Sequence, residues 1–310
     1  MRPMRAALLW ASTNRWLAAR ISHRAFARRA VRRFLPGEDL EDAITAALRM
    51  RDQGVRTIFT ELGENVADAA AVRAVADHYA HALDRVAQAG LDCYLSVKPT
   101  HLGLDLDPAL CAESLRRLTA AAAAHRNLVW LDMESSTYTD ATIELFRALR
   151  GDYSNTGICL QANLRRTAAD IDALLPLAPT VRLVKGAYAE PADRALTTKA
   201  DVDAAYFEHA RKLLGAADPG TGQVIGIATH DVPLIRRIAA AAESMGRGRD
   251  SFQVQMLYGI HQRHQLQLAR EGFHVRVLIS YGEYWFPWYM RRLAERPANV
   301  WFVVRSLFAR

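Results

Sequence analysis

The stretch FHVRVLISYGEYWFPWYMRRLAERPANVWFVVRSLF, residues 273–308, carries a strand pattern and a helix pattern in immediate succession. Val275, Val277 and Ile279 alternate with other residues, which places them on one face of a predicted strand. After a break, Pro287 stands where the first turn of a helix tolerates it. The stretch therefore predicts a strand that leads directly into a helix.

Four residues of this helix share one side, because they stand at i, i+3, i+4 and i+7: Trp288, Arg291, Arg292 and Glu295. Two adjacent guanidinium groups suit the binding of a planar carboxylate or phosphate. A solvated ladder of salt bridges is the plainer interpretation. Six aromatic side chains precede the Arg pair, more than a surface helix needs, and they favour a binding site. They are Tyr281, Tyr284, Trp285, Phe286, Trp288 and Tyr289.

The same succession of a short apolar run, a loop and a helix recurs along the chain. Strands are predicted over residues 57–62, 93–98, 128–133, 157–162, 181–187, 224–229, 252–257 and 273–279. Helices are predicted over residues 40–52, 68–89, 109–124, 139–150, 168–175, 200–214, 233–245, 261–271 and 287–295. Eight strands, each followed by a helix, predict a (β/α)8 TIM-type barrel with extra N-terminal helices. A doubly wound open sheet is the alternative, but no G-x-G-x-x-G follows the first strand.

The chain has 310 residues, 51% hydrophobic and 24% charged, as in ordinary soluble globular proteins. Its net charge of +7 is concentrated at the start: residues 1–37 hold nine Arg, no Lys and no acidic residue. The remainder has 31 basic and 33 acidic residues, so its charge gives no reason to expect nucleic-acid binding. We divide the chain into a basic helical segment, residues 1–52, and a catalytic barrel, residues 53–310.

The N-terminal segment has apolar residues at helical spacing from about residue 14 to residue 34. Arg15, Arg20 and Arg24 interrupt the apolar run and no small-residue cleavage site follows, so a secretory signal is not expected. No run approaches the roughly 20 apolar residues of a membrane-spanning helix. An Arg-rich start without acids suits a helix on an anionic membrane, and it also resembles an organellar presequence. Solvated helices packed on the body are the plain alternative.

Cysteine and histidine patterns give no metal site and no disulfide framework. Cys93, Cys111 and Cys159 are scattered without a CxxC pair, which indicates a reduced, cytoplasmic setting. His261 and His264 have a spacing usable for metal ligands, but both are expected to face solvent. A nucleophile elbow and a P-loop are both lacking.

In a barrel of this kind, chemistry takes place at the carboxyl ends of the strands. Nearly every predicted strand ends in ionisable or amide side chains, more than helix caps alone need. Strand by strand, these include Glu61 and Glu64, Lys98, Asp132 and Glu134, Gln161 and Asn163, Arg182 and Lys185, Thr229, His230 and Asp231, and Gln255. We therefore expect a binding site at this rim.

Lys98 and Asp132 end neighbouring strands and can form an ion pair, either structural or positioned for a substrate amine. Lys185, followed by Gly186, offers a cation and a close backbone approach to a phosphate or ring edge. His230 can donate to a cofactor, although a lone histidine is more often a satisfied polar group. Two classes of enzyme remain open. One uses a cofactor on a small carboxylated substrate, and the other uses Lys98 or Lys185 to form a Schiff base.

Motifs at nearly every strand resemble the proline dehydrogenase (proline oxidase) family, in its monofunctional bacterial form. They are SVK (96–98), LDME (131–134), QANLRRT (161–167), RLVKGAY (182–188), ATHD (228–231), FQVQMLYG (252–259) and RRLAERPAN (291–299). The resemblance runs from about residue 40 to the C-terminus, and RLVKGAY and RRLAERPAN are its most specific parts. It implies a (β/α)8 barrel that binds FAD at the rim. It also implies oxidation of L-proline to Δ1-pyrroline-5-carboxylate, with hydride transfer to the flavin and then electron transfer to a membrane quinone.

The resemblance also implies roles for individual residues. Arg291 and Arg292 would bind the substrate carboxylate, with Lys98 and Asp132 as the polar pair beneath it. Tyr188 and Leu257 would wall the substrate ring. Arg182 would lie by the reactive edge of the flavin, and Glu295 would reach the cofactor or orient the Arg pair. The remaining cofactor residues would be Met133, Gln161, Val184, Lys185, Gly186, Ala187, Thr229, His230 and Gln255.

Three positions depart from the family pattern: Leu278 and Trp288 each replace a usual Tyr, and Asp231 replaces the commoner Asn. A rebuilt pocket is compatible with proline and also with a bulkier or modified cyclic amino acid. A catalytically silent barrel is a weaker alternative, because Lys98, Asp132 and the Arg pair are retained. We expect no second catalytic domain, and a cytoplasmic protein whose basic N-terminus contacts the inner face of the membrane.

Overall fold

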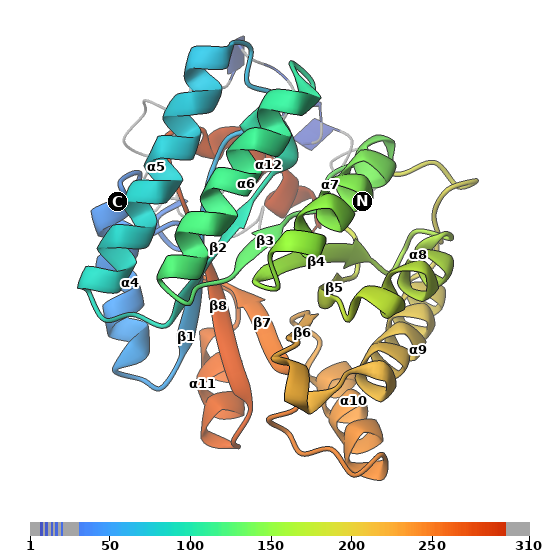
Figure 1. Ribbon diagram of the computed structural model, residues 1–310. Coiled ribbons are helices and arrows are strands. Elements are labelled where there is room, and N and C mark those ends of the chain that lie inside the picture. Colours follow the sequence, from blue (N-terminus) through green and yellow to red (C-terminus); the bar gives the residue numbers. More distant parts are fainter. Residues whose placement is uncertain are drawn as a thin grey trace.

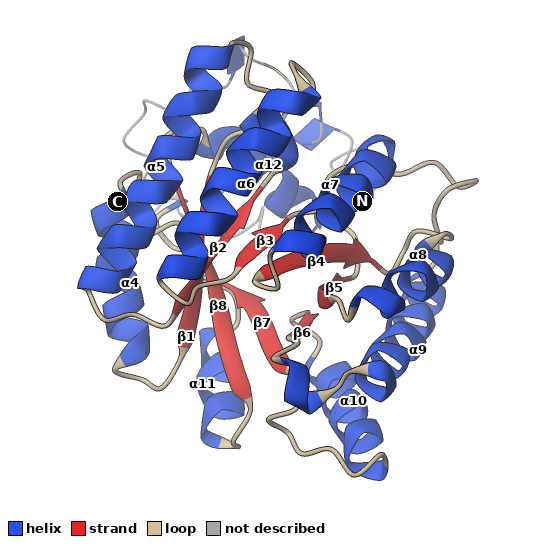
Figure 2. Cartoon of the chain, viewed as in Figure 1, coloured by secondary structure: helices blue, strands red, loops and turns tan. Residues whose placement is uncertain are grey.

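The computed structural model describes residues 31–295, together with residues 7–8, 10–11, 14, 16–17 and 20; the side chains of residues 219, 291, 292, 294 and 295 are not described. Of the predicted N-terminal helical segment, residues 21–30 and most of residues 1–20 therefore lie outside the described residues. The body of the chain is a ring of strands surrounded by helices, as Figure 1 and Figure 2 show.

Within the described part of the chain, eight parallel strands form a closed barrel in sequential order, with β8 paired to β1. The strands are β1 (Arg56–Glu61), β2 (Cys93–Val97), β3 (Val129–Leu131), β4 (Thr156–Gln161), β5 (Thr180–Val184), β6 (Ile225–Ala228), β7 (Gln253–Leu257) and β8 (His274–Tyr281). The closed ring confirms the predicted (β/α)8 barrel and excludes the open sheet, and each predicted strand overlaps an observed one.

Helices cover the outside of the ring. They are α5 (Ala69–Gln88), α6 (Pro108–Ala124), α7 (Thr139–Asp152), α8 (Thr167–Leu174), α9 (Lys199–Ala216), α10 (Val232–Ser244) and α11 (Gln262–Arg270). Shorter 3-10 helices are η1 (Pro99–Leu102), η2 (Ser136–Tyr138), η3 (Leu175–Leu177) and η4 (Pro219–Thr221).

Side-chain caps account for several helix starts. Asp68, Asp107, Thr198 and Asp231 each accept a backbone N–H of the first turn of α5, α6, α9 and α10, respectively. Such a bond satisfies one of the amide groups that a helix N-terminus leaves without an intrahelical partner. The caps place the starts of these helices just beyond the carboxyl ends of the preceding strands.

Two helices depart from the regular strand–helix repeat. α4 (Leu40–Arg51) precedes β1 and packs against β1 and β8, where the helix after β8 stands in a regular barrel. α12 (Trp285–Glu295) follows β8 and instead contributes Trp288, Tyr289 and Leu293 to a cavity lined by strand ends. The helix that carries the Arg pair therefore lies at the carboxyl rim.

A small separate core attaches the chain before α4 to α12. It contains Val31, Phe34, Leu35, Trp285, Phe286, Tyr289 and Leu293. The Trp285 indole also donates to Glu38 Oε1 at 3.0 Å. The rings that we interpreted as the sign of a binding site are thus largely structural: Trp285, Phe286 and Tyr289 are buried in this core, and Trp288 lines the rim.

The two faces of β8 have different roles. Val275, Val277 and Ile279 belong to the main hydrophobic core between the barrel and its helices, which confirms their predicted common face. The alternate residue Leu278 packs with the inner cluster of Ile58 and Trp130. Side chains on this inner face of the strands fill the barrel and form the floor of the rim.

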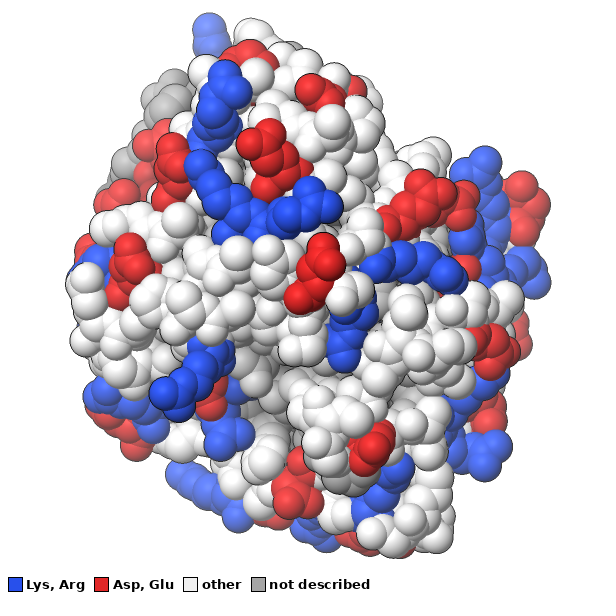
Figure 3. Space-filling view, viewed as in Figure 1, with Lys and Arg blue, Asp and Glu red and all other residues white. Residues whose placement is uncertain are grey.

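Surface charge is mixed on the face that Figure 3 shows, where Lys and Arg alternate with Asp and Glu. That face therefore offers no continuous basic surface for nucleic acid. Among the helices of the described residues, none combines the length and the apolar character needed to cross a bilayer.

Candidate active site

A cavity of about 630 Å³, here called the rim cavity, opens at the carboxyl ends of the strands. All the cofactor residues expected from the sequence except Glu295 line it, as do four of the expected substrate residues: Met133, Gln161, Arg182, Val184, Lys185, Gly186, Ala187, Thr229, His230 and Gln255, with Lys98, Asp132, Tyr188 and Leu257. The side chains of Arg291, Arg292 and Glu295 lie outside the described residues. The structure therefore brings together every expected cofactor or substrate residue whose side chain it describes, whereas the strand-end residues Glu61, Glu64, Glu134 and Asn163 do not line this cavity.

Arg182 lines the cavity from β5, and the residue is only 4% exposed. Its Nη1 donates to Ser96 Oγ and to Asp132 Oδ1, each at 2.8 Å, and its Nε donates to Gln255 Oε1 at 2.7 Å. Ser96 Oγ also donates to Asp132 Oδ1 at 2.7 Å. Residues of β2 and β7 and the residue that follows β3 thus hold one guanidinium group in a fixed orientation.

The predicted ion pair between Lys98 and Asp132 is wrong, because each has a different partner. Asp132 pairs with Arg182 across the barrel, whereas Lys98 Nζ contacts Glu64 Oε2 at 3.4 Å and the Gly63 carbonyl at 3.3 Å. Adjacent strand ends suggested the pairing, but the longer Arg182 side chain reaches Asp132 from β5. Lys98 bonds instead to the loop that follows β1.

Lys185 is held between two carboxylates. Its Nζ donates to Asp203 Oδ1 and to Asp231 Oδ2, the latter at 2.9 Å, and Lys199 contacts the same two carboxylates. Burial alone would raise the pKa of Asp203 and Asp231, but hydrogen bonds and the positive charge of the lysines outweigh it and lower both pKa values. Asp231, which replaces the commoner Asn of the family pattern, therefore brings a carboxylate that is paired with Lys185.

Glu134 lies shortly after β3 and is only 4% exposed. Its carboxylate accepts from the Thr100 N–H at 3.0 Å and from the Thr100 hydroxyl at 2.6 Å. Burial raises the pKa of Glu134, although both bonds oppose the shift. Its backbone carbonyl accepts from Gln161 Nε2 at 2.7 Å, which fixes the Gln161 amide at the cavity wall.

One buried polar atom at the rim cavity fits a flavin. Arg182 lines the cavity, and its Nη2 has no hydrogen-bond partner among the described residues. An unpaired buried group is costly, so a ligand that supplies the missing partner gains affinity. A flavin ring offers acceptors for this donor.

Gly186 is the one residue of the wall formed by residues 185–187 that carries no side chain. It has φ of +105°, and a Cβ atom there would come within 2.0 Å of Asn163 Oδ1. Only glycine therefore fits this turn without strain or collision. Gly186 lines the rim cavity, and its backbone permits close approach of a ring edge or a phosphate.

Leu278 and Trp288, the two departures from the family pattern, both line the rim cavity. Leu278 is on β8 beside the polar Ser280, and Trp288 is on α12. Apolar surface therefore stands in the cavity where two hydroxyl groups were expected. In our hypothesis both replacements alter the part of the cavity that binds the substrate. Neither residue is a hydrogen-bond partner of Arg182.

Sequence reasoning missed several lining residues. Phe34, Thr60, Cys159, Lys199 and Ser280 all face the cavity. Thr60 and Ser280 carried the signal of an inner-face position at a strand end, and Lys199 follows a helix cap. Phe34 carried no such signal, because it reaches the rim only through tertiary packing with α12.

His261 and His264 are exposed, as predicted. Within the described residues, no group of three or more His, Cys, Asp or Glu side chains is arranged to hold a metal ion. The rings of His261 and His264 stack on each other, with centroids 5.2 Å apart.

Comparison with known proteins agrees with these motifs. Residues 43–305 match the family model described as proline dehydrogenase. The chain is 36% identical over 280 residues to proline dehydrogenase 2 of Bacillus subtilis subsp. natto, covering 90% of each chain. It is also 36% identical over 284 residues to a proline dehydrogenase of Deinococcus radiodurans, covering 89% of each.

Solved structures resemble the fold. A proline utilization A (PutA) structure from Bdellovibrio bacteriovorus aligns with a TM-score of 0.80 at 23% identity, covering 87% of this chain and 33% of the other. A Bradyrhizobium japonicum PutA aligns with a TM-score of 0.73 at 25% identity, covering 90% and 32%. The chain spans about a third of the length of these PutA chains. By the family match and the relatives that it resembles along most of their length, the chain belongs to the proline dehydrogenase family.

Proposed function

We propose that this protein oxidises L-proline to Δ1-pyrroline-5-carboxylate, with FAD as the hydride acceptor and a quinone as the final electron acceptor. The observation that carries the proposal is the Arg182 array, in which a buried cation on the floor of the rim cavity keeps one donor, Nη2, without a partner. Membership of the proline dehydrogenase family supports the choice of substrate.

FAD would be held by the backbone of residues 185–187, by the amides of Gln161 and Gln255 and by Thr229 and His230. When bound, the flavin supplies an acceptor for the hydride that leaves the carbon next to the proline nitrogen. Arg182 would donate from Nη2 to the flavin ring. Because Trp130, Ser96 and Asp132 surround its guanidinium, Arg182 needs no reorganisation during the reaction.

The substrate would lie between Tyr188 and Leu257, with its carboxylate on Arg291 and Arg292 of α12. A bidentate Arg clamp orients a carboxylate and thereby the ring to which it is attached. Because Trp288, Tyr289 and Leu293 of α12 line the cavity, this helix would also shield the bound substrate from water.

Electrons would leave to a membrane quinone, with the N-terminal segment as the membrane contact. Trp10 and Trp16 are 64% and 65% exposed, and the Arg20 guanidinium lies 5.1 Å from the Trp16 ring centroid. Exposed tryptophan beside arginine suits the interface of an anionic membrane. Cosedimentation with anionic but not with neutral vesicles would support this contact, and failure to cosediment with either would exclude it.

A bulkier or modified cyclic amino acid is the second candidate substrate. Leu278 and Trp288 favour it, because both place apolar surface in the cavity where the family usually has tyrosine. The flavin chemistry would be the same, and only the ring that fits between Tyr188 and Leu257 would differ.

A Schiff-base mechanism is disfavoured by the bonds of the two lysines. Lys185 donates to two carboxylates and Lys98 to Glu64, so both side chains are engaged in ion pairs instead of being presented to a substrate carbonyl. A silent barrel is disfavoured by the unpaired Arg182 donor, which has no structural use.

The first experiment is an absorption spectrum of the purified protein, followed by addition of L-proline without oxygen. A flavin spectrum that bleaches supports both cofactor and substrate. A flavin spectrum that persists with L-proline but bleaches with a larger cyclic amino acid supports the second candidate. A folded protein without flavin would overturn the proposal.

A further inference from the structure

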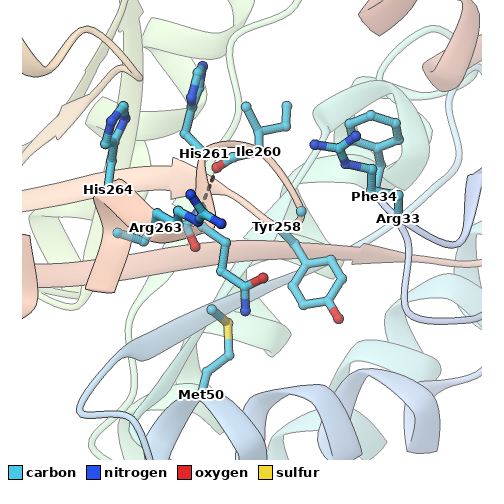
Figure 4. A pocket seen from close by; sticks show the side chains of 11 residues that line it. Arg33, Phe34, Met50, Tyr258, Ile260, His261, Arg263 and His264 are labelled. Atoms are coloured by element: carbon cyan, nitrogen blue, oxygen red, sulfur yellow. Dashed lines mark hydrogen bonds between the residues drawn. The ribbon is translucent and has the colours of Figure 1, made fainter. Parts of the chain in front are cut away.

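A second cavity, here called the side cavity, adjoins the rim cavity. Phe34 and Ile260 line both cavities and so form a common wall. The side cavity has a volume of about 540 Å³ and is lined by residues 33–34, by Met50 of α4 and by residues 258–265 at the start of α11. Figure 4 shows Arg33 and Phe34 on one side of it and His261 and His264 on the other.

The lining of the side cavity combines flat apolar surface with hydrogen-bond donors. Phe34, Met50, Tyr258 and Ile260 supply rings and alkyl groups, and the arginine and histidine side chains around the opening supply N–H donors: Arg33, His261, Arg263 and His264. A small aromatic ring with polar oxygens at its edge matches both parts.

Gln265 gives the side cavity an acceptor without a partner. Its side chain is fully buried, and Nε2 donates to the carbonyls of Leu257 and Ile260 at 2.9 and 2.8 Å. Because a carbonyl can only accept, these two bonds fix which amide atom is nitrogen. Oε1 has no hydrogen-bond partner among the described residues, so a ligand with a hydroxyl group would satisfy it.

Three imidazole rings extend from one cavity to the other. His230 lines the rim cavity, and its ring centroid is 6.0 Å from that of His261. His261 in turn stacks on His264, with centroids 5.2 Å apart and ring planes inclined by 13°. Histidine can give up and regain a proton near neutral pH, so such a row suits a cavity in which protons are transferred.

We propose that the side cavity binds the ring of the quinone that accepts the electrons. This inference rests on the proposed function. A quinone ring is flat, and its two carbonyl oxygens would accept from the arginine and histidine donors. After reduction the same oxygens are hydroxyl groups, and one of them would donate to Gln265 Oε1. Only the wall of Phe34 and Ile260 would separate this ring from the flavin cavity.

The reaction balances without a further reactant. Conversion of the CH–NH bond of proline to C=N releases two electrons and two protons. The quinone takes up both and becomes a hydroquinone, so proline is oxidised and quinone is reduced in equal amounts. His261 and His264 would hold and pass protons at the quinone oxygens.

The two half-reactions can be measured separately with the holoenzyme and ubiquinone-1. Anaerobic L-proline first bleaches the flavin, and ubiquinone-1 is then mixed with the reduced protein while the flavin colour returns. His264→Trp places an indole at the opening of the side cavity, and His264 is exposed, so folding is preserved. We expect the rate constant of reoxidation to fall about tenfold, the effect of losing a moderate binding contact.

His81→Trp is the matched control, because His81 is an exposed histidine on α5 and lines neither cavity. It should reoxidise as fast as the wild type. Equal reoxidation rates in His264→Trp and the wild type would overturn the quinone site. If proline does not bleach the wild-type flavin, the proposed function fails, and the quinone site fails with it.

A binding measurement without turnover completes the test. The oxidised protein is irradiated with an azido-ubiquinone analogue and digested, and the labelled peptide is identified by mass spectrometry. We expect label within residues 258–265 and loss of label in His264→Trp. Label at any other place, or label that ubiquinone-1 does not compete away, would overturn the proposal.

Discussion

The guanidinium group of Arg182 lies over the indole ring of Trp130, with Cζ 4.7 Å from the ring centroid. Trp130 is fully buried on β3, and its partner on the neighbouring strand β4 is Gly157. There, a Cβ atom on Gly157 would come within 2.6 Å of the ring. The absence of a side chain at Gly157 thus leaves room for Trp130, which in turn supports Arg182 from below.

Replacing Trp130 should impair stability and activity together. Trp130→Leu removes most of a buried ring, and we expect the free energy of unfolding to fall by about 3 kcal/mol in urea titrations. Arg182 would lose its support, so kcat for proline should also fall. Trp130→Phe retains an aromatic face and should recover most of kcat. Equal activity of the Leu and Phe variants would show that the ring does not position Arg182.

Adding a methyl group at Gly157 should be harmful although the change is small. Gly157→Ala drives a Cβ atom into the Trp130 ring, and we expect a loss of about 1–3 kcal/mol in the free energy of unfolding. Gly151→Ala is the control, since no atom lies within 4 Å of its added Cβ and the residue is helical. That change should stabilise the protein by roughly 0.5–1 kcal/mol. Thermal or urea unfolding that ranks the two variants the other way would contradict the packing.

Asp231→Asn should make the bound flavin easier to reduce. The change removes one of two carboxylates from Lys185 and leaves more positive charge beside the proposed cofactor, while asparagine still caps α10. We expect the midpoint potential to rise by roughly 20–40 mV, about 1–2 kcal/mol for a two-electron couple. Spectroelectrochemical titration gives this value. Asp77→Asn is the control, because Asp77 is exposed and paired with Arg117, and it should leave the midpoint potential unchanged. An unchanged midpoint potential in Asp231→Asn would show that the charge of Lys185 does not act on the flavin.

Leu278→Tyr should improve the use of proline. The new hydroxyl group would stand in the rim cavity beside Ser280, and we expect kcat/KM for L-proline to rise about tenfold. Leu278→Phe fills the same volume without the hydroxyl group and should give a smaller gain. Steady-state kinetics with L-proline and a larger cyclic amino acid compare the variants. If Tyr does no better than Phe, the hydroxyl group has no part in substrate binding.

Glu61 should make the folded protein less stable as the pH rises. Burial raises the pKa of its carboxyl group to about 7 from an ordinary value of 4.5, and Oε2 has no hydrogen-bond partner among the described residues. The folded state therefore binds the proton more tightly than the unfolded state, and stability decreases between pH 4.5 and pH 7.

Glu61→Gln removes this dependence, because the amide has no charge to lose. We expect the variant to exceed the wild type by up to about 3 kcal/mol above pH 7 and by little at pH 4.5. Urea unfolding across this range measures the difference. A constant difference between variant and wild type at all pH values would mean that Glu61 does not titrate in this window.

The strand pattern alone predicted the barrel and part of the residues at its rim, and the family motifs added others. Alternation in β8 and the recurrence of apolar runs report which side of a strand is buried, and this is a local property that needs no knowledge of the partner strand. Polar residues at strand ends then had to meet at one rim, because the strands of a (β/α)8 barrel are parallel. Several of these residues line the rim cavity, among them Arg182, Lys98 and Asp132.

Only the tertiary structure decided which of these groups are bonded to one another. Arg182 reaches Ser96, Asp132 and Gln255 across positions up to 86 residues apart in the chain, and Lys98 pairs with Glu64 instead of Asp132. Partners of this kind depend on the register of the closed ring and on the length of each side chain. The hydrophobic periodicity of one strand determines neither the register of the ring nor the reach of a side chain to its partner.

The place of α12 was likewise decided by packing. Its amphipathic pattern was legible in the sequence, but the pattern does not say which surface the apolar side covers. α4 occupies the outer surface of β1 and β8, and Phe34 and Leu35 pack with Trp285 and Tyr289. These contacts bring α12 to the rim, because an apolar helix face is buried wherever the fold leaves complementary apolar surface exposed.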